Sequence, residues 1–566
     1  MLRGRTNAGF GRIDQEGRYV LFILLAIWVG AWIWVARFHY LDDALIHLRY
    51  ADMLRAHGFL TFDGVHPSHG TSSLLYVALL AAAGRILPSV FLPKVLSVTG
   101  YVVLLGLTLR RAWKAVRVAW DLWLLLLLIL ASPMAVRWFT DGMETSLATA
   151  LALMVGYSAM PDPASSAGSG KSVAPMLLAF AWVLLRVETA FLLAFVCLGN
   201  AIYRFGTLAQ GGRAATKAVP WPSRPCSSTG GTPVAQNLRS AKRSSGIVVQ
   251  GARLGDSLRA MAREIQLAVG AALAVFAILV ITGHIIPDTA TAKAAGFYGV
   301  IAYARDVVVS FAASFSLGLG LLLFWVASMI LAWTHAEKAK LWALGVVNLA
   351  LPAELFIAML RGQTMQGVRY FLPAVVMMVA WNLAFLEMSW RSKGSVLTRD
   401  DPQSLLSRFR LPIIGGLALL MLCEWALEGH VVRGIIAQRS AAFREMRSQH
   451  LEVLAGHAGV AYDIGFISYF TRASVCDMNG LVHGSQFASA SADERAKRCA
   501  ESSPVFAFVN NWQREDLSAW INFQDWTTCH TYELSNVFHR DTHYLLVRPD
   551  LAPVGCPGGD SANTLH

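Results

Sequence analysis

The sequence predicts an α-helical polytopic membrane protein that ends in a soluble α/β domain, and three observations lead to this fold class. Of the 566 residues, 55% are hydrophobic and only 15% are charged, whereas soluble proteins carry about 25% charged residues. The apolar residues gather in long runs that are separated by polar segments. Residues 430–566 are polar enough for a soluble domain and hold four of the seven cysteines.

The net charge of +12 does not indicate a nucleic-acid partner. The basic residues lie in segments between apolar runs, which is the distribution expected of cytoplasmic loops. No DNA or RNA recognition motif accompanies them. We therefore expect no nucleic acid among the partners and attribute the charge to membrane topology.

The first expected span covers residues 19–35. Four arginines precede it, at positions 3, 5, 12 and 18, so we expect it to run outward from the cytoplasm. The run is too long for the core of a signal peptide, and no small-residue cleavage site follows it, so it should remain as a span. Residues 36–73 then form the first external loop.

Ten further apolar runs follow in residues 74–427, and with the first they suggest eleven to thirteen spans. They cover about 74–87, 90–109, 122–133, 147–160, 175–203, 265–286, 307–333, 341–360, 370–386 and 411–427. The basic residues at 110–117 should be cytoplasmic, but a simple count of spans places them outside. Two explanations would resolve this conflict. Either one run is a half-span, or the interruption at Arg186 and Glu188 is a turn between two short helices. The topology of residues 74–203 stays open.

Residues 204–263 are rich in Gly, Ser, Pro and basic residues. This composition cannot bury a core and predicts a disordered cytoplasmic loop. Attraction to anionic lipid headgroups is the functional alternative. The loop divides a transmembrane domain, residues 1–429, whose last span delivers residues 430–566 to the external face.

The external domain should be a small α/β domain with up to two disulfides. Its cysteines are Cys476, Cys499, Cys529 and Cys556, and an even number in one domain favours disulfides and an oxidising compartment. Free or zinc-bound thiols are the alternative, although no CxxC spacing is present. Segments 460–469 and 505–509 are expected to be buried strands, and 439–454 and 492–500 helices.

Two adjacent carboxylates, Asp42 and Asp43, follow the first span. Each prefers water when ionised, and side by side they repel and raise one another's pKa, so they are unlikely packing residues. In a helix after Leu41, Asp43, His47 and Tyr50 share one face, while Asp42 and Arg49 lie on another. We interpret the pair as the chemical centre of a membrane enzyme.

Other charged residues mark the outer ends of expected spans, namely Asp141, Glu144, Lys293 and Arg369. Arg186 and Glu188 interrupt an apolar run, where a charge costs about 2.5–3.5 kcal/mol, so they need partners or a polar cavity. A local salt bridge is their structural explanation, and snorkelling to the headgroups is that of Lys293. A Lys and an Arg that face an acidic pair suggest a phosphate site beside a base.

These motifs, taken in order, resemble the GT-C superfamily of polytopic glycosyltransferases, in particular the mycobacterial terminal arabinofuranosyltransferases. The resemblance covers most of the chain except the basic loop. It rests on Asp42-Asp43-Ala44-Leu45-Ile46-His47-Leu48-Arg49-Tyr50-Ala51, Gly70-Thr71-Ser72-Ser73-Leu74-Leu75, Gly142-Met143-Glu144-Thr145, Arg186-Val187-Glu188, Pro287-Asp288-Thr289 with Lys293, Arg369-Tyr370-Phe371-Leu372-Pro373, Asp463-Ile464-Gly465 and Asp477-Met478-Asn479-Gly480-Leu481.

The resemblance implies an inverting transfer of sugar from a polyprenyl-phosphate donor to a cell-envelope glycan or lipid acceptor. The location would be the external face of a bacterial cytoplasmic membrane, among membrane lipids. Asp42 or Asp43 would be the general base, with Asp42 slightly favoured, because a sugar hydroxyl needs a carboxylate to take its proton. Lys293, Arg369 or His284 would stabilise the leaving phosphate. The residues expected to contact substrate are Arg49, Glu144, Arg186, Glu188, Asp288 and Tyr370.

The chain departs from the family pattern at three places, which leaves the donor sugar, a hexose or a pentose, open. Asp288 stands where the family usually has Asn, Val187 stands where it often has Pro, and Ser68-His69-Gly70-Thr71 replaces a Glu-Gly-Tyr-Thr-like stretch. Some family members use a divalent metal ion. An Asp/His metal site in the first loop is therefore the alternative to four solvated histidines at positions 47, 57, 66 and 69.

A transporter or flippase of lipid-linked sugar precursors is the alternative function. It would use the same charged groups for binding and alternating access. The external domain and the position of the motifs at the outer face, away from mid-membrane, favour the enzyme. An assembly protein without catalytic activity is a third reading.

Overall fold

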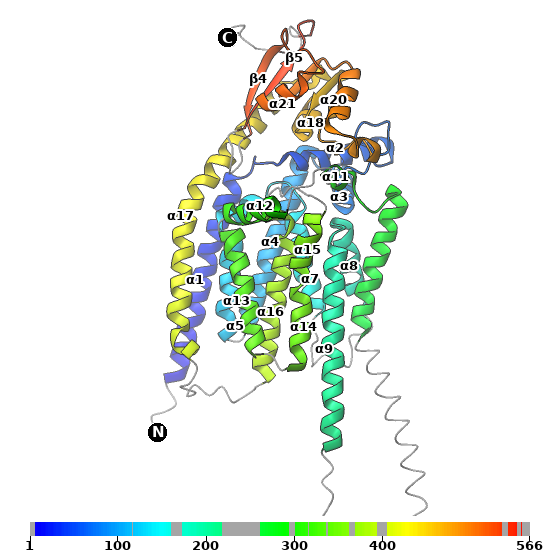
Figure 1. Ribbon diagram of the computed structural model, residues 1–566. Coiled ribbons are helices and arrows are strands. Elements are labelled where there is room, and N and C mark those ends of the chain that lie inside the picture. The colour runs from blue at the N-terminus through cyan, green and yellow to red at the C-terminus, as the bar shows by residue number, and fades with distance from the viewer. Residues whose placement is uncertain are drawn as a thin grey trace, which may run out of the picture.

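The computed structural model describes residues 6–115, 117–159, 172–217, 261–293, 300–314, 316–335, 338–360, 368–392, 405–534, 541–551 and 556. It has a bundle of long helices with a smaller domain that holds a sheet at one end (Figure 1). This arrangement confirms the predicted fold class, a helical membrane protein with a C-terminal α/β domain.

The bundle contains most of the helices. They are α1 (Thr6–Val35), α3 (Leu74–Ala83), η1 (Ser89–Phe91), α4 (Leu92–Lys114), α5 (Arg117–Leu130), α6 (Pro133–Phe139), α7 (Thr145–Ala159), α8 (Ala174–Leu185), α9 (Thr189–Lys217), Met261–Thr282, α12 (Val300–Ala313), η3 (Ser316–Gly320), α13 (Leu321–His335), α14 (Lys338–Asn348), α15 (Ala350–Leu360), η4 (Val368–Tyr370), α16 (Leu372–Ser392) and the first part of α17 (Leu405–Ser448). Helices α2 (Asp42–His57) and α11 (Asp288–Lys293) lie where the bundle meets the C-terminal domain (Figure 1). We keep the name external domain, after its expected location, for this domain at residues 430–566.

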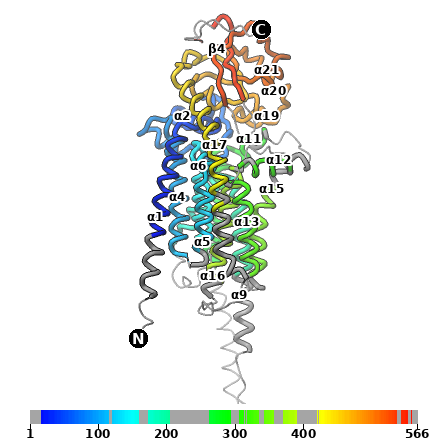
Figure 2. The backbone as a smooth tube through the Cα atoms, turned by 90° about the vertical axis from the view of Figure 1, so that its left-hand side faces the viewer, coloured from blue at the N-terminus to red at the C-terminus, as the bar shows by residue number. Residues whose placement is uncertain are grey.

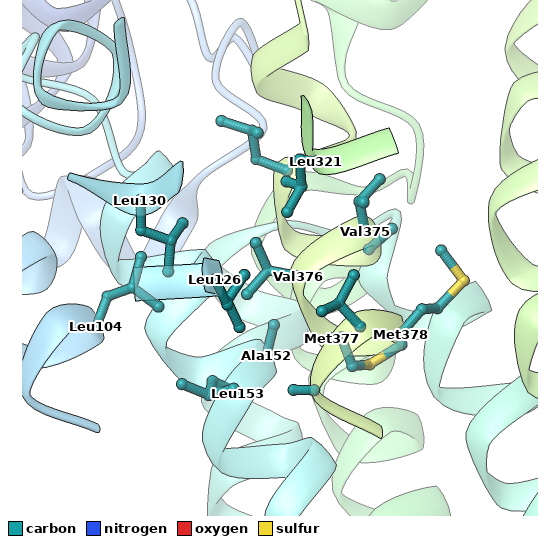
Figure 3. Packing of buried hydrophobic residues seen from close by; sticks show 14 of the residues in the cluster. Leu104, Leu126, Leu130, Ala152, Leu153, Leu321, Val375, Val376, Met377 and Met378 are labelled. Atoms are coloured by element: carbon teal, nitrogen blue, oxygen red, sulfur yellow. The ribbon is translucent and has the colours of Figure 1, made fainter. Parts of the chain in front are cut away.

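Helix α16 is the centre of the bundle. Its apolar window is 94% buried, whereas the window of α1 is only 6% buried. A helix that is apolar on all sides needs protein or lipid around it, and α16 finds protein. Figure 3 shows Val375, Val376 and Met377 of α16 close to Leu126 of α5 and Leu153 of α7. Helix α1 leaves its apolar side chains exposed, as expected of a helix that faces lipid.

The number of full-length spans depends on how short helices are counted. Within the described residues, five helices are long and apolar enough to cross a membrane, and a sixth forms if Trp120–Leu130 and Pro133–Phe139, bent by 66°, are one span. Five more apolar helices have only 10–17 residues, whereas a crossing takes about 20. If each of these also crosses, the count reaches the lower end of the predicted eleven to thirteen.

The apolar run at 175–203 is two helices, α8 and α9, with Arg186 and Glu188 in the turn between them. This confirms one of the two explanations offered for that run. Helix α9 continues to Lys217, and the helix Met261–Thr282 covers the last three residues of the predicted loop. The disorder predicted for 204–263 is therefore wrong for 204–217 and 261–263. The first proline after α9 is Pro220, and nothing before it stops the helix. Residues 218–260 of the predicted loop lie outside the described residues.

The external domain contains a five-stranded mixed sheet in the order β2-β1-β3-β5-β4. Strands β1 (Ala458–Ala461), β2 (Ser474–Asp477) and β3 (Phe506–Val509) are parallel, and β4 (Thr527–Glu533) and β5 (Thr542–Val547) are antiparallel. The helical elements are η5 (Leu451–Leu454), α18 (Ile464–Thr471), α19 (Ser485–Ala488), α20 (Ala492–Glu501) and α21 (Asn511–Leu517). The helices expected at 439–454 and 492–500 and the strand at 505–509 are confirmed.

The strand predicted over 460–469 is wrong over most of its length, because β1 covers only residues 460 and 461 of this segment and residues 464–469 belong to α18. Every residue of α18 is buried. A short run that is apolar throughout does not distinguish a buried strand from a buried helix. The result is a β1–α18–β2 unit, and its helix α18 packs against α2.

Two disulfides are present, as predicted. Cys476 of β2 pairs with Cys499 of α20, with Cα atoms 5.5 Å apart, and Cys529 of β4 pairs with Cys556, with Cα atoms 5.0 Å apart. Helix α17 runs without a break from the bundle into the external domain (Figures 1 and 2). The proposed boundary at residue 430 therefore lies inside a continuous helix, which connects the two parts rigidly.

Candidate functional site

The site begins at the N-terminus of α2, which carries both members of the acidic pair. Leu41 is the N-cap residue, and Asp42 and Asp43 form the first turn, where the helix dipole favours negative charge. The backbone N–H of Leu41 donates to the carbonyl oxygen of Asp141 at 3.1 Å. The helix expected after Leu41 is thus confirmed, and it is joined to the segment that contains Glu144.

Asp42 binds the external domain. Its carboxylate accepts the backbone N–H groups of Gly465 at 2.9 Å and Phe466 at 2.8 Å, in the first turn of α18. Burial and the neighbouring Asp463 carboxylate raise the pKa of Asp42 to about 8 despite these bonds. A carboxyl group whose two oxygens already accept backbone N–H groups is poorly placed to take a proton from a substrate.

Gly465 makes this contact possible. A Cβ at this position would overlap the carbonyl group of Asp42. We expect Gly465→Ala to push α18 away from α2 and to destabilise the protein by about 1–3 kcal/mol, the usual cost of overpacking, as a lower midpoint of thermal unfolding in detergent. Gly434→Ala is the matched control, because a Cβ on Gly434 in α17 meets no atom within 4 Å. An equal melting temperature for both variants would contradict the proposed tight contact.

Asp43 faces the bundle and pairs with Arg369 of η4. The Arg369 side chain is only 3% exposed, while that of Asp43 keeps 24% exposure. Arg369 also donates to the Tyr370 hydroxyl at 3.1 Å, and its guanidinium carbon lies 5.0 Å from the centre of the Tyr370 ring. A solvent-accessible carboxylate therefore lies directly beside a buried cation.

The same tyrosine connects this pair to a second group of charges. The guanidinium carbon of Arg186 lies 5.0 Å from the Tyr370 ring centre. Arg186 is 2% exposed and lies between two carboxylates, at 2.6 Å from Glu188 and 3.9 Å from Glu144. The local Arg186–Glu188 salt bridge offered as the structural explanation is confirmed, and the structure adds Glu144 as a second partner.

Glu144 continues the network to α2 and the first loop. Its Oε2 lies 3.4 Å from Nε2 of His47, and Nδ1 of His47 lies 2.8 Å from Oγ1 of Thr71. Asp43 and His47 therefore share one face of α2, as the helical spacing predicted. Five of the sequence motifs, at 42–51, 70–75, 142–145, 186–188 and 369–373, are joined by the contacts from Asp43 to Thr71.

The first loop also meets the Pro287-Asp288 motif. Asp288 and His69 exchange hydrogen bonds: the backbone N–H of His69 donates to Oδ2 of Asp288, and the backbone N–H of Asp288 donates to the His69 carbonyl, both at 2.9 Å. The rings of His69 and His284 lie 5.2 Å apart, and His284 is 3.7 Å from Asp288. These contacts place His284 beside the first loop.

The second motif of the external domain packs on the first loop. Asp477 is fully buried and accepts the backbone N–H groups of Asn479, Leu481 and Val482, which shapes a tight turn. A Cβ on Gly70 would overlap the Leu481 carbonyl oxygen. The Asp463-Ile464-Gly465 and Asp477-to-Leu481 motifs therefore both lie where the external domain contacts the loop that carries the acidic pair.

Among the described candidate side chains, that of Arg49 lies outside the network. Arg49 is 7% exposed, and its Nε donates to the Phe62 carbonyl at 3.4 Å, so it supports the first loop. Lys293 is the last residue of α11, and its side chain lies outside the described part of the structure. The predicted phosphate contact at Lys293 stays a prediction.

The four first-loop histidines have separate neighbours. The contacts of His47 and His69 are given above. The ring of His57 lies close to Gly64, and His66 pairs with Asp63 at 2.8 Å. Within the described residues, the group of three side chains that could hold a metal ion is found elsewhere, at Asp463, Asp541 and His543.

Sequence reasoning left three residues near the pair out of the candidate site. Asp141 is fully buried, and burial raises its pKa to about 7 despite the nearby Arg369. Arg137 on α6 is 2% exposed, and Arg439 on α17 donates to the Leu534 carbonyl at 2.9 Å. Asp141 was recognised as a charge at the end of a span, but Arg137 and Arg439 lie in helices whose sequences gave no comparable signal.

Fold and site together define a membrane-embedded helical protein with a charged site at one end of its bundle, beneath a disulfide-bonded α/β domain. No family model and no curated protein matches the chain. The chain is similar to two solved structures, ArnT from Cupriavidus metallidurans bound to undecaprenyl phosphate and the same protein in the apo state. Each similarity covers 94% of this chain and 98% of the other, with a TM-score of 0.47 and identities of 11% and 13%. No assignment rests on a similarity of this size.

Proposed function

We propose that the protein is a membrane glycosyltransferase that moves a sugar from a polyprenyl-phosphate donor to a cell-envelope glycan or lipid acceptor. The observation that carries the proposal is the Asp43–Arg369 pair, in which a partly exposed carboxylate contacts a buried guanidinium group at the end of the bundle. The ordered motifs of the GT-C superfamily meet around it. A base next to an anion-binding group is what transfer from a sugar phosphate requires.

In the proposed reaction, Asp43 accepts the proton of an acceptor hydroxyl. The hydroxyl oxygen then bonds to the anomeric carbon of the donor, the bond from that carbon to the phosphate oxygen breaks, and its electron pair remains on the leaving polyprenyl phosphate. Attack from the face opposite the leaving group inverts the anomeric configuration. We assign the base role to Asp43 in preference to Asp42, because Asp42 is engaged with the amides of α18.

Arg369 has two roles in this proposal. Without donor it neutralises Asp43, which favours the ionised carboxylate. A donor phosphate competes for the guanidinium, which binds phosphates through several N–H groups, and so frees Asp43 to accept a proton. His284 and Lys293 are further candidates for the phosphate.

The remaining charged groups suit the recognition of sugar hydroxyls. Glu144, Glu188 and Asp288 offer acceptor oxygens, and Arg186 orients the two glutamates. The external domain closes over the first loop and is a candidate for acceptor recognition. Its disulfides fit the external side of a bacterial cytoplasmic membrane.

The purified protein in liposomes tests the function. A polyprenyl-phosphate sugar with a radiolabelled sugar is placed in the bilayer with an extract of cell-envelope acceptors, and two quantities are followed: new glycosidic product and passage of the intact donor between leaflets. We expect product formation that depends on both donor and acceptor. Translocation of intact donor without a new glycosidic bond would overturn the proposal in favour of a flippase.

A further inference from the structure

A buried histidine in the external domain lies between two carboxylates. His543, in β5, is 0% exposed. Asp463, the N-cap residue of α18, places Oδ2 at 2.8 Å from its Nε2, and Asp541, just before β5, places Oδ1 at 3.9 Å from its Nδ1. One possible ligand atom from each of the three residues lies within 4.8 Å of the others.

The imidazole is not satisfied by these neighbours. Neither ring nitrogen of His543 has a partner in hydrogen-bond geometry among the described residues, although the Asp463 oxygen is close enough in distance. An unsatisfied polar atom in the interior costs about 1–3 kcal/mol. One nitrogen of this imidazole and one oxygen of each carboxylate lie close enough together to be ligands of a single ion.

The charged groups around His543 carry a net negative charge that a cation would balance. Asp42 and Asp43 lie near the group and add to its negative charge, while the Arg439 guanidinium of α17 faces Asp463, Asp541 and Asp42. Asp541 also accepts a hydrogen bond from Asn510 at 2.8 Å, which fixes the direction of its carboxylate. Carboxylates thus outnumber the arginine at this point of the domain.

We propose that His543, Asp463 and Asp541 bind a divalent transition-metal ion of the zinc type. An imidazole nitrogen with two carboxylate oxygens suits Zn²⁺ or Mn²⁺, whereas Mg²⁺ and Ca²⁺ prefer oxygen ligands alone. The proposed metal site does not depend on the transfer reaction, although the proposed base Asp43 lies near it. Because Asp463 caps the helix that receives Asp42, the ion would join β5 to the helix that contacts the membrane domain.

The test uses the full-length protein in detergent, stripped with EDTA and then given Zn²⁺ alone. Bound metal is counted by plasma mass spectrometry after desalting, and thermal unfolding is followed with and without the ion. We expect about one zinc per chain and a higher melting temperature with zinc. His543→Ala and, as an isosteric second variant, Asp541→Asn should weaken binding by about 10- to 100-fold, while His457→Ala should bind as the wild type does.

Two results would overturn the site. One is wild-type protein that retains no stoichiometric zinc and does not gain stability from it. The other is zinc affinity in His543→Ala and Asp541→Asn equal to that of the wild type. Since the readouts are metal content and thermal stability, they do not depend on whether the protein transfers sugar.

Discussion

Replacing Asp43 by Asn should reduce sugar transfer by about 10²–10⁴-fold, the range expected when a general base is lost. The change removes the ability to accept a proton but keeps the shape of the side chain next to Arg369. We expect kcat to fall while the chain still inserts into the membrane and folds. Transfer from a polyprenyl-phosphate sugar under saturating donor and acceptor measures the effect.

Asp42→Asn is the matched control for this prediction. Asn keeps one acceptor oxygen for the amides of Gly465 and Phe466 but loses the second, so its main effect should be a lower thermal stability. If Asp42→Asn abolished transfer at unchanged stability while Asp43→Asn remained active, the base would be Asp42 and the assignment to Asp43 would be wrong.

Replacing Arg369 by Gln should be the second large effect, about 10²–10³-fold in kcat. The change removes the cation that is proposed to hold the donor phosphate in the transition state, and Gln cannot supply a positive charge at this buried position. We also expect a higher KM for the donor and weaker inhibition by free polyprenyl phosphate. Arg369→Lys keeps the charge but loses the planar fork, so it should recover only part of the activity.

Arg472→Gln provides the comparison for Arg369. Arg472 pairs with Asp52 of the same helix α2 at 3.0 Å, but its side chain is 40% exposed and the pair is remote from the motif network. An exposed pair contributes about 0–1 kcal/mol, so this variant should keep donor KM and kcat near wild-type values. Equal losses in both variants would indicate that disturbing α2 matters in general and would remove the phosphate role of Arg369.

The local parts of the site were predictable from the sequence because a helix repeats every 3.6 residues. The shared face of Asp43 and His47 follows from their spacing, and the salt bridge of Arg186 and Glu188 follows from two charges two residues apart in an apolar run. Local composition also predicted the two disulfides, although not their pairing. In the first two cases the paired residues lie close together in the sequence. In the third, the C-terminal domain has only four cysteines.

The long-range contacts were not predictable from a single sequence. Asp42 and Gly465 are 423 positions apart and His69 and Asp288 are 219 positions apart, and no periodicity connects such pairs. For this reason the sequence, which slightly favoured Asp42 as the base, did not predict that Asp42 binds the backbone of α18. The same limit explains α18 itself, because an eight-residue apolar run does not reveal whether it will be buried as a strand or as a helix.

The most direct test of the central claim follows the phosphorus of the donor. In ³¹P NMR of the protein in detergent micelles, a polyprenyl-phosphate sugar is a phosphodiester, and transfer of its sugar leaves a phosphate monoester with a distinct, pH-dependent resonance. We predict that the monoester appears only when acceptor is present, and that Asp43→Asn suppresses it while Arg472→Gln does not. A phosphodiester signal that persists with the wild-type protein, donor and a cell-envelope acceptor extract together would contradict the account.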